Sequence, residues 1–447
     1  MFPSLTTRSW VIVVAVMSAC ALTLSLTGVA AATKVTATQA DRPLSTCFWV
    51  GPYTTARGEE FNTAFPDSGA IYWPARYTPP SGSRLVFHGQ YPHARYMSLN
   101  SYNAETAAPT DALNDLHTNP DPGSSNPFLP GALRTDGEHF YTTTVVGTPP
   151  PDDPSDREPN TLYAGVPDQD EQMLILRVYV PDKNRDLTGD VGLPEPELQL
   201  ANGRVLRGEK LCKAVHASQE GLSVTKLPLS TYLSLRDQPD KPSTFPAQNP
   251  PLFRAYYNSA FSIQCAYLGE CGGNPPRTGG QYSNIDNNYL SAYVNREFGP
   301  VLVLRGTLPT TPPTFQRVPV MQEGQLRYWS ICQNESYATT RGAGCLYDEQ
   351  VPVDAENQYT IVTSLPGDRP SNATERCGVG YVPWPENGDG AGHPNDGFVI
   401  VRNMLPAADF HQAVQDTKLP GDEEQVLGPY LPRGTYMTTA EFEQLGC

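Results

Sequence analysis

The sequence predicts a mostly β protein that contains two related sandwich repeats and a few short helices. Proline (45) and glycine (37) are spread along the 447 residues and accompany 23 tyrosines. This composition is typical of many short strands joined by turns. Apolar residues also gather in short stretches of strand length. Finally, a set of short phrases occurs twice in the same order, which indicates an internal duplication.

The repeated phrases are individually weak, but their shared order is what a duplication preserves. They are residues 85–89 and 302–306, residues 95–98 and 327–330, residues 113–115 and 346–348, residues 141–142 and 359–360, and a closing phrase with Ile175, Arg177 and Pro181 in one copy and Ile400, Arg402 and Pro406 in the other. We therefore divide the mature chain into an N-terminal segment with the first repeat (41–216), a connector (217–295) and a second repeat (296–447).

Local patterns predict the separate elements. Residues 172–180 form an apolar, β-branched run that ends at Pro181, and residues 288–296 alternate between two sets of side chains. Both patterns predict strands. Helical patterns are few, and they predict helices at 229–236, at 407–417 and, behind an N-capping Thr439, at 440–445.

The N-terminus has the pattern of a secretory signal. Arg8 is the one charge in the first eight residues, and an apolar run follows from Trp10 to Ala32. Its small-residue end predicts cleavage after Ala32. The run is also long enough to stay as a membrane anchor, and Cys20 ends a poor lipobox. We expect a secreted or extracytoplasmic protein whose mature chain does not insert into a membrane.

The charge of the chain limits its partners. The formal net charge is −16 at pH 7, and no basic stripe is present. Such a chain is a poor candidate for binding nucleic acid or anionic lipid. We therefore expect no nucleic-acid partner.

The cysteines predict disulfides. Nine are present, and eight remain once Cys20 leaves with the signal, an even number in an oxidising compartment. The sequence contains no Cys-x-x-Cys pair, so we favour disulfides over a metal cluster. Cys332 and Cys345 flank a hairpin-like stretch and are the first predicted pair, and Cys265 could close a tight loop with Cys271. The pairing of the other four stays open: Cys47, Cys212, Cys377 and Cys447.

The repeat phrases resemble those of exported bacterial proteins in the domain-of-unknown-function families 1254 and 1214. The likeness rests on the Arg-Tyr-x-Ser phrase at 95–98, the Leu-x-Asp phrase, the strand with Arg177, and the stretch 381–385 before 398–402. It implies a fold of two tandem jelly-roll-like β-sandwich repeats. It implies no reaction and no catalytic residue.

Four duplicated arginines lie inside apolar strands: Arg95, Arg177, Arg327 and Arg402. A buried guanidinium must be paired, and the repeated Asp115 and Asp348 are natural partners. The alternative is that these arginines clamp a carboxylate or sulfate ligand. We favour the structural role, because two copies of a ligand site are less needed than two copies of a fold.

Two patterns suggest metal sites, and neither is strong enough for us to expect a metal or other cofactor. His88 and His93 have a His-x-x-x-x-His spacing, but His88 aligns with Arg305, which does not bind metal. Residues 182–190 place an oxygen side chain at every second position, like the front half of a calcium loop. Leu187 and Leu193 stand where that loop needs Gly and Glu, so we interpret the segment as a polar turn.

The best candidate ligand site is the polar, aromatic segment of the connector. Amides and carboxylates beside flat rings suit a sugar, although the same residues could form a turn that opens a strand. Two long loops, 148–159 and 385–397, are further places where a sandwich could hold a ligand. The candidate ligand-binding residues are Tyr282, Asn284, Asp286, Asn287 and Tyr289.

These patterns favour an exported protein that binds a glycan or small polar molecule between the repeats. The alternative is a secreted hydrolase or lyase with a site assembled from both repeats. Motifs of the common serine hydrolases, zinc proteases and nucleotide enzymes are absent from the sequence. The catalytic residues of such an enzyme therefore stay unknown.

Overall fold

The structure is a computed structural model, and it describes residues 45–55, 61–135 and 137–447. The predicted signal peptide, with its alternatives of a membrane anchor and a lipidation site, lies outside these residues. Residues 45–447 belong to a single structural unit. Among the described residues, no helix is both long enough and apolar enough to cross a membrane.

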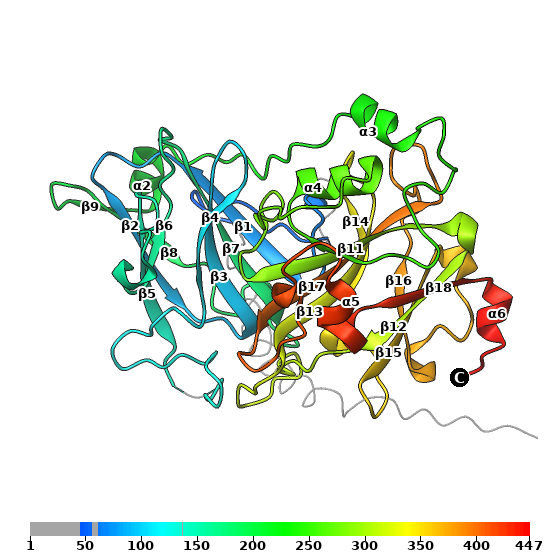
Figure 1. The fold of residues 1–447 in the computed structure, drawn as a ribbon. Helices are drawn as coiled ribbons and strands as arrows, with labels where there is room; N and C mark the ends of the chain where they lie inside the picture. Colours follow the sequence, from blue (N-terminus) through cyan, green and yellow to red (C-terminus); the bar gives the residue numbers. More distant parts are fainter. Residues whose placement is uncertain (1–44, 56–60, 136) are drawn as a thin grey trace, which may run out of the picture. The chain divides into compact units, whose positions relative to one another are not determined.

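The mostly β prediction is confirmed, because strands build four sheets in the described residues (Figure 1). Two sheets form the first half of the chain, with the strand orders β1-β7-β3-β4 and β6-β5-β2-β8-β9. Their strands are β1 (Ala70–Tyr77), β2 (Arg84–Gln90), β3 (Ala94–Tyr102), β4 (Pro109–Asn114), β5 (Phe140–Val146), β6 (Thr161–Tyr163), β7 (Gln172–Pro181), β8 (Glu195–Gln199) and β9 (Val205–Arg207).

Two further sheets form the second half, with the orders β10-β11-β17-β13-β14 and β16-β15-β12-β18. Their strands are β10 (Arg254–Tyr256), β11 (Asn287–Asn295), β12 (Val301–Thr307), β13 (Leu326–Asn334), β14 (Gly342–Tyr347), β15 (Gln358–Ser364), β16 (Val379–Pro383), β17 (Asp396–Pro406) and β18 (Arg433–Met437).

The two halves share one strand order. If ten is added to the number of each strand from β1 to β8, the strand orders of the first two sheets become those of the second two. The edge strands β9 and β10 have no equivalent. The parallel pairing of β5 with β6 also recurs, as β15 with β16. The strand β11 lies in the predicted connector, yet it pairs with β17 along its whole length. That each half is a jelly roll stays a prediction.

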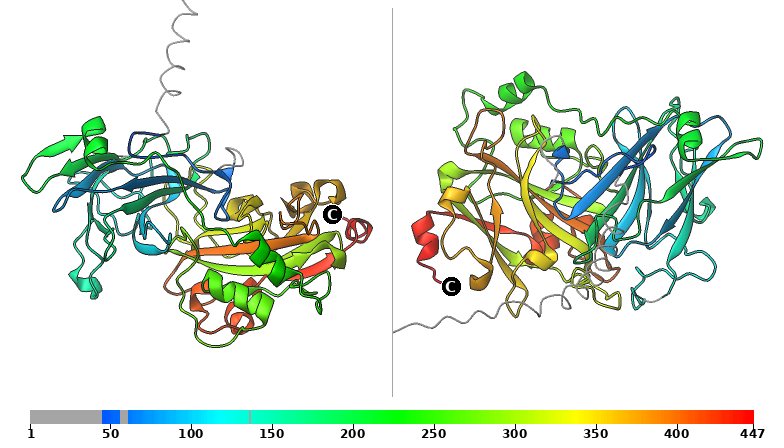
Figure 2. Two further views of the ribbon diagram at one scale, coloured as in Figure 1. Left: turned by 90° about the horizontal axis from the view of Figure 1, so that it is seen from above. Right: turned by 180° about the vertical axis from the view of Figure 1, so that it is seen from behind.

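The helices are short and lie outside the sheets, and Figure 2 shows α3 and α4 close together. The α-helices are α2 (Gly208–Ala214), α3 (Leu229–Arg236), α4 (Ser259–Ile263), α5 (Glu423–Leu427) and α6 (Thr439–Glu443). The one-turn helices are η3 (Pro154–Asp156), η4 (Gln264–Leu268), η5 (Arg296–Phe298), η6 (Asp348–Gln350), η7 (Pro366–Asp368), η8 (Glu375–Cys377), η9 (Val414–Asp416) and η10 (Gly428–Tyr430).

Of the three predicted helices, α3 has the predicted bounds. The helix α6 begins one residue early, because Thr438 and not Thr439 caps it by accepting a hydrogen bond from the Glu441 N–H. The helix predicted at 407–417 is wrong, since only the single turn η9 forms there. The side chain of Asn403 in β17 accepts a hydrogen bond from the Val414 N–H, 3.1 Å away. This tertiary contact takes a donor that a longer helix would use.

Each half has its own hydrophobic core between its two sheets. Trp73 and Phe87 lie in the first core, and Trp329 and Trp384 lie in the second. All four side chains are buried. Burial of such rings removes a large apolar area from water and stabilises each sandwich separately.

Four disulfides cross-link the described residues. The predicted pairs Cys332–Cys345 and Cys265–Cys271 are both present. The first joins β13 to β14 at directly opposed positions. The four remaining cysteines pair as Cys47–Cys212 and Cys377–Cys447.

The halves contact each other through reciprocal ion pairs. Arg95 of β3 binds Asp348 at 2.9 Å, and Arg327 of β13, its repeat equivalent, binds Asp115 at 3.4 Å. The predicted partners are therefore correct for Arg95 and Arg327, although each arginine pairs with the aspartate of the other repeat. Neither aspartate pairs with Arg402, which lies beside Asp67. Each aspartate also accepts a backbone N–H of its own repeat. Such reciprocity is the signature of an isologous contact, as in a twofold dimer.

Candidate functional site

A cavity of about 320 Å³ lies where the faces of the two repeats meet. Its floor comes from β7 and β17, the strands that carry the closing phrase. In β7, Leu174 and Leu176 point into the core of the first half, whereas Ile175 and Arg177 line the cavity. Successive side chains of a strand point to opposite faces, and both faces of β7 are buried. This double burial explains why its sequence is an almost continuous apolar run.

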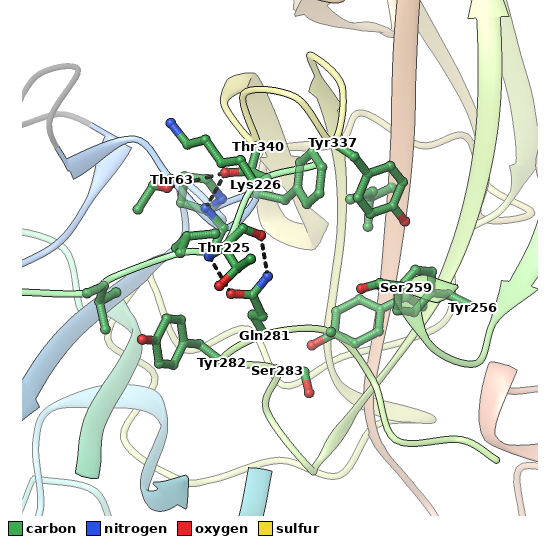
Figure 3. Close-up of a pocket in the computed structure, with 18 of the residues that line it drawn as sticks. Thr63, Thr225, Lys226, Tyr256, Ser259, Gln281, Tyr282, Ser283, Tyr337 and Thr340 are labelled. Carbon is green, nitrogen blue, oxygen red and sulfur yellow. Dashed lines mark hydrogen bonds between the residues drawn. The ribbon is translucent and has the colours of Figure 1, made fainter. Parts of the chain in front are cut away.

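The cavity walls are mainly aromatic. Aliphatic side chains and a few hydroxyls, such as those of Ser259 and Thr340, complete them (Figure 3). Flat rings offer a large apolar contact area together with phenolic hydrogen-bonding groups. The aromatic lining residues are Tyr53, Phe61, Phe65, Tyr72, Tyr179, Tyr256, Tyr282, Tyr289, Tyr337 and Phe398.

In the described part of the chain, the charged residues that line the cavity are all cations. They are Arg177, Arg402 and, on an exposed segment, Lys226. Among the described residues, the lining contains no Asp, Glu, His or Cys, although the chain has a net charge of −16. The cavity is therefore a positive region of an acidic protein.

Arg177 and Arg402 are repeat equivalents that face one cavity. Arg177 stands opposite Tyr72 in the pairing of β1 with β7, and Arg402 stands opposite Tyr289 in the pairing of β11 with β17. Only 3% of Arg177 and 5% of Arg402 is exposed. Because the repeats pack with these faces together, two copies of one arginine contribute to a single site. The fact that an arginine is duplicated therefore does not show that its role is structural, because both copies can belong to one ligand site.

The segment 222–228 crosses the cavity as a strap. Figure 3 shows the contact that holds its middle: the Thr225 N–H donates to the Gln281 Oε1, and the Gln281 Nε2 donates to the Thr225 carbonyl, both at 2.7 Å. Near its start, the Ser223 carbonyl accepts a hydrogen bond from the Tyr282 hydroxyl at 2.7 Å. The Leu227 N–H donates to the Tyr337 carbonyl. Few side-chain contacts therefore keep this cover in place.

The five predicted ligand-binding residues divide into two groups. Tyr282 and Tyr289 line the cavity. Asn284, Asp286 and Asn287 do not line it and instead join the repeats. The Asp286 carboxylate accepts hydrogen bonds from the Tyr96 hydroxyl at 2.6 Å and from the Asn114 amide at 2.9 Å. Asn287 begins β11, and its amide lies 3.4 Å from the Tyr179 hydroxyl.

Burial keeps the phenols of Tyr72, Tyr289 and Tyr337 neutral. It raises the pKa of Tyr72, Tyr289 and Tyr337 well above the ordinary value, because the phenolate would lose its hydration. Neighbouring tyrosines raise these pKa values further. At neutral pH these side chains are hydrogen-bonding groups and not bases.

The other sequence candidates lie away from the cavity. Within 182–190, Asp182 pairs with Arg134 and Asp190 with Arg185, each at 2.6 Å, so both carboxylates already have a cationic protein partner. His88 lies 3.7 Å from Glu197 on the surface of the first half. The loops 148–159 and 385–397 contribute no residue to the cavity lining. They are also not equivalent, because the first precedes β6 and the second follows β16.

A second polar cluster, which the sequence analysis missed, joins α3 to the loop 385–397. The ring of His393 lies 2.6 Å from Asp389 and 2.7 Å from Asp237. Arg236 binds Asp396 at 2.6 Å. Burial would lower the pKa of His393, but hydrogen bonding and the charge of Asp389 outweigh it and raise this pKa. The two arms are more than 150 residues apart, so no local motif signals the cluster.

Comparisons with known proteins identify no family. No protein-family model matches the chain, and no curated protein matches it. An uncharacterized protein from Burkholderia cenocepacia is 12% identical, with 89% of this chain and 84% of that one covered and a TM-score of 0.44. The VPA0106 protein from Vibrio parahaemolyticus is 10% identical, with 84% and 90% covered and a TM-score of 0.38. Similarities this weak support no argument about this chain.

Proposed function

We propose that this is an extracytoplasmic binding protein for a small amphipathic molecule, which it holds in the cavity between its repeats. The observation that supports this most is the cavity itself: its volume is about 320 Å³, and ten of the described residues in its walls are aromatic. Ligand sites are commonly concave, mainly apolar and placed at junctions between structural units. Four disulfides fit an oxidising compartment, and the predicted signal peptide fits export.

The wall chemistry favours a compact ligand with a flat apolar body over a glycan. A sugar needs many hydrogen-bond partners for its hydroxyls, whereas this cavity offers mainly rings and aliphatic groups. A hydrolase or lyase would need an acid or base beside the ligand. Among the described lining residues there is no Asp, Glu or His, and burial keeps Tyr72, Tyr289 and Tyr337 protonated, so these groups favour binding over turnover.

A neutral fluorophore tests the proposal. N-phenyl-1-naphthylamine brightens in apolar sites, so titration of the purified protein should give saturable binding with one site per chain. Leu222→Trp places a bulky ring on the strap at the cavity, and we expect it to weaken binding at least tenfold. Leu229→Trp is the matched control, because Leu229 is 55% exposed and does not line the cavity.

Absence of saturable binding, or equal loss in the Leu222 and Leu229 variants, would contradict a ligand site in this cavity. A sugar panel titrated in parallel separates the ligand classes. Displacement of the fluorophore by a sugar at micromolar concentration would support a glycan ligand instead.

A further inference from the structure

Arg177 differs from the other duplicated arginines in its partners. Arg95 and Arg327 pair with carboxylates across the repeat junction, and Arg402 lies 3.5 Å from Asp67. Among the described residues, no carboxylate forms an ion pair with Arg177. Its Nε donates to the Asn100 side chain at 3.0 Å, and its Nη2 donates to the Tyr102 hydroxyl and the Tyr282 carbonyl.

Comparison of the repeats shows which residue of the second repeat stands where Arg177 would need a carboxylate partner. Asp67 and Asn284 precede the equivalent residues Tyr72 and Tyr289 by the same number of positions. Their contacts are also equivalent: Asp67 accepts a hydrogen bond from the Tyr328 hydroxyl at 2.8 Å, and the Asn284 amide lies 3.1 Å from the Tyr96 hydroxyl. A carboxylate in one repeat is thus a neutral amide in the other.

This substitution leaves one buried charge uncompensated. Asp67 offsets Arg402, and Lys226 is exposed to solvent, whereas Arg177 is 97% buried beside the cavity it lines. Burying an unpaired charge costs several kcal/mol of folding free energy. Polar partners and the ring of Tyr72, whose centroid lies 5.0 Å from the guanidinium carbon, offset part of that cost. A negative ligand group would offset the rest.

We propose that the cavity binds an amphipathic monocarboxylate, whose carboxylate pairs with Arg177 and whose apolar body lies against the tyrosine rings. The inference rests on the proposed function, since it names the ligand class of the same cavity. The Nη1 of Arg177 has no protein acceptor among the described residues, so it is the group that would donate to the ligand. A single uncompensated charge suits a monoanion, and Asp67 beside Arg402 disfavours a dianion.

A matched set of probes tests the charge separately from the cavity. We would measure binding of 2-naphthoate, its uncharged methyl ester and the dianionic 2-naphthyl phosphate by calorimetry above pH 7.5. We expect 2-naphthoate to bind at least tenfold more tightly than the ester, and more tightly than the phosphate. Tighter binding of the phosphate would overturn the monoanion assignment. Equal affinity for acid and ester would overturn the anion site while leaving the proposed function in place.

Two variants locate the charge effect. Asn284→Asp introduces the carboxylate of the other repeat, and we expect it to remove the preference for acid over ester without lowering the melting temperature. Arg177→Gln should remove the same preference. Asn288→Asp is the matched control, because Asn288 accepts a hydrogen bond from Arg277 and does not line the cavity.

The outcomes separate the two proposals. An acid preference that survives both Asn284→Asp and Arg177→Gln would refute the role of Arg177. If neither the acid nor the ester binds the wild-type protein, the proposed function fails, and this inference fails with it.

Discussion

The junction between the repeats provides the sharpest test of the architecture, through the Arg95→Met variant. Arg95 is fully buried and contacts Asp348 at 2.9 Å and also Glu349. The side chains of these carboxylates are only 1% and 12% exposed. Removal of the guanidinium therefore leaves two poorly hydrated negative charges side by side. Breaking a buried pair in this way typically costs about 3–5 kcal/mol of unfolding free energy.

Urea denaturation followed by tryptophan fluorescence measures this cost. Arg433→Met is the matched control, because Arg433 and Glu424 form an ion pair whose side chains are 54% and 66% exposed. Water screens both charges of such an exposed pair, so we expect the control to leave the unfolding free energy almost unchanged. Adding Asp348→Leu to Arg95→Met should recover part of the loss, since it removes one of the uncompensated charges. A loss below about 1 kcal/mol for Arg95→Met, or no recovery in the double variant, would refute this account of the junction.

Three further predictions concern the strap, the histidine cluster and the N-terminal disulfide. Gln281→Ala removes both hydrogen bonds to Thr225, so stopped-flow release of N-phenyl-1-naphthylamine should become several-fold faster, and an unchanged rate would show that the strap does not gate the cavity. The pKa of His393 is raised in the folded state, so its contribution to stability is complete below the ordinary pKa of about 6.5 and is lost as pH rises through the raised value. Melting curves between pH 5 and 9 should therefore decline less with pH in His393→Gln than in the wild type, and parallel curves would contradict this. Cys47 and Cys212 close a loop of 165 residues, so replacing both with serine should cost about 2–5 kcal/mol, measured by urea denaturation against the less constraining Cys265–Cys271 pair.

Much of the fold could be predicted from local sequence. Short apolar stretches between prolines and glycines predict strands, because a strand needs only alternating or buried side chains over a few residues. The repeated phrases predicted which strands are equivalent, and the hairpin between Cys332 and Cys345 predicted their disulfide. The helix predicted at 407–417 was wrong, and the side chain of Asn403 in β17 takes one of the backbone donors that such a helix would use.

The site could be predicted only in part. Tyr282 and Tyr289 line the cavity, but Asn284 and Asp286 bind Tyr96 across the junction instead. The same polar, aromatic pattern serves both purposes, and the difference depends on which surface each side chain meets. The rest of the cavity comes from segments far apart in sequence, including residues 61–66 and 222–228, which share no motif.

By itself, the sequence determined that the chain is rich in strands and that it contains one fold pattern twice. Both properties depend on the order of side chains within short segments, which can be read without knowing the tertiary structure. It could not determine what the duplicated arginines do. All four arginines lie in apolar strands, so the sequence does not distinguish Arg95 and Arg327 from Arg177 and Arg402. The first two form ion pairs across the junction, whereas the other two line the cavity. The tertiary structure decided this, since packing two equivalent faces together pairs one set of charges across the junction and directs the other set into a shared cavity. Whether a buried charge is structural or functional depends on its counter-charge, and Arg177 is the duplicated arginine without one among the described residues.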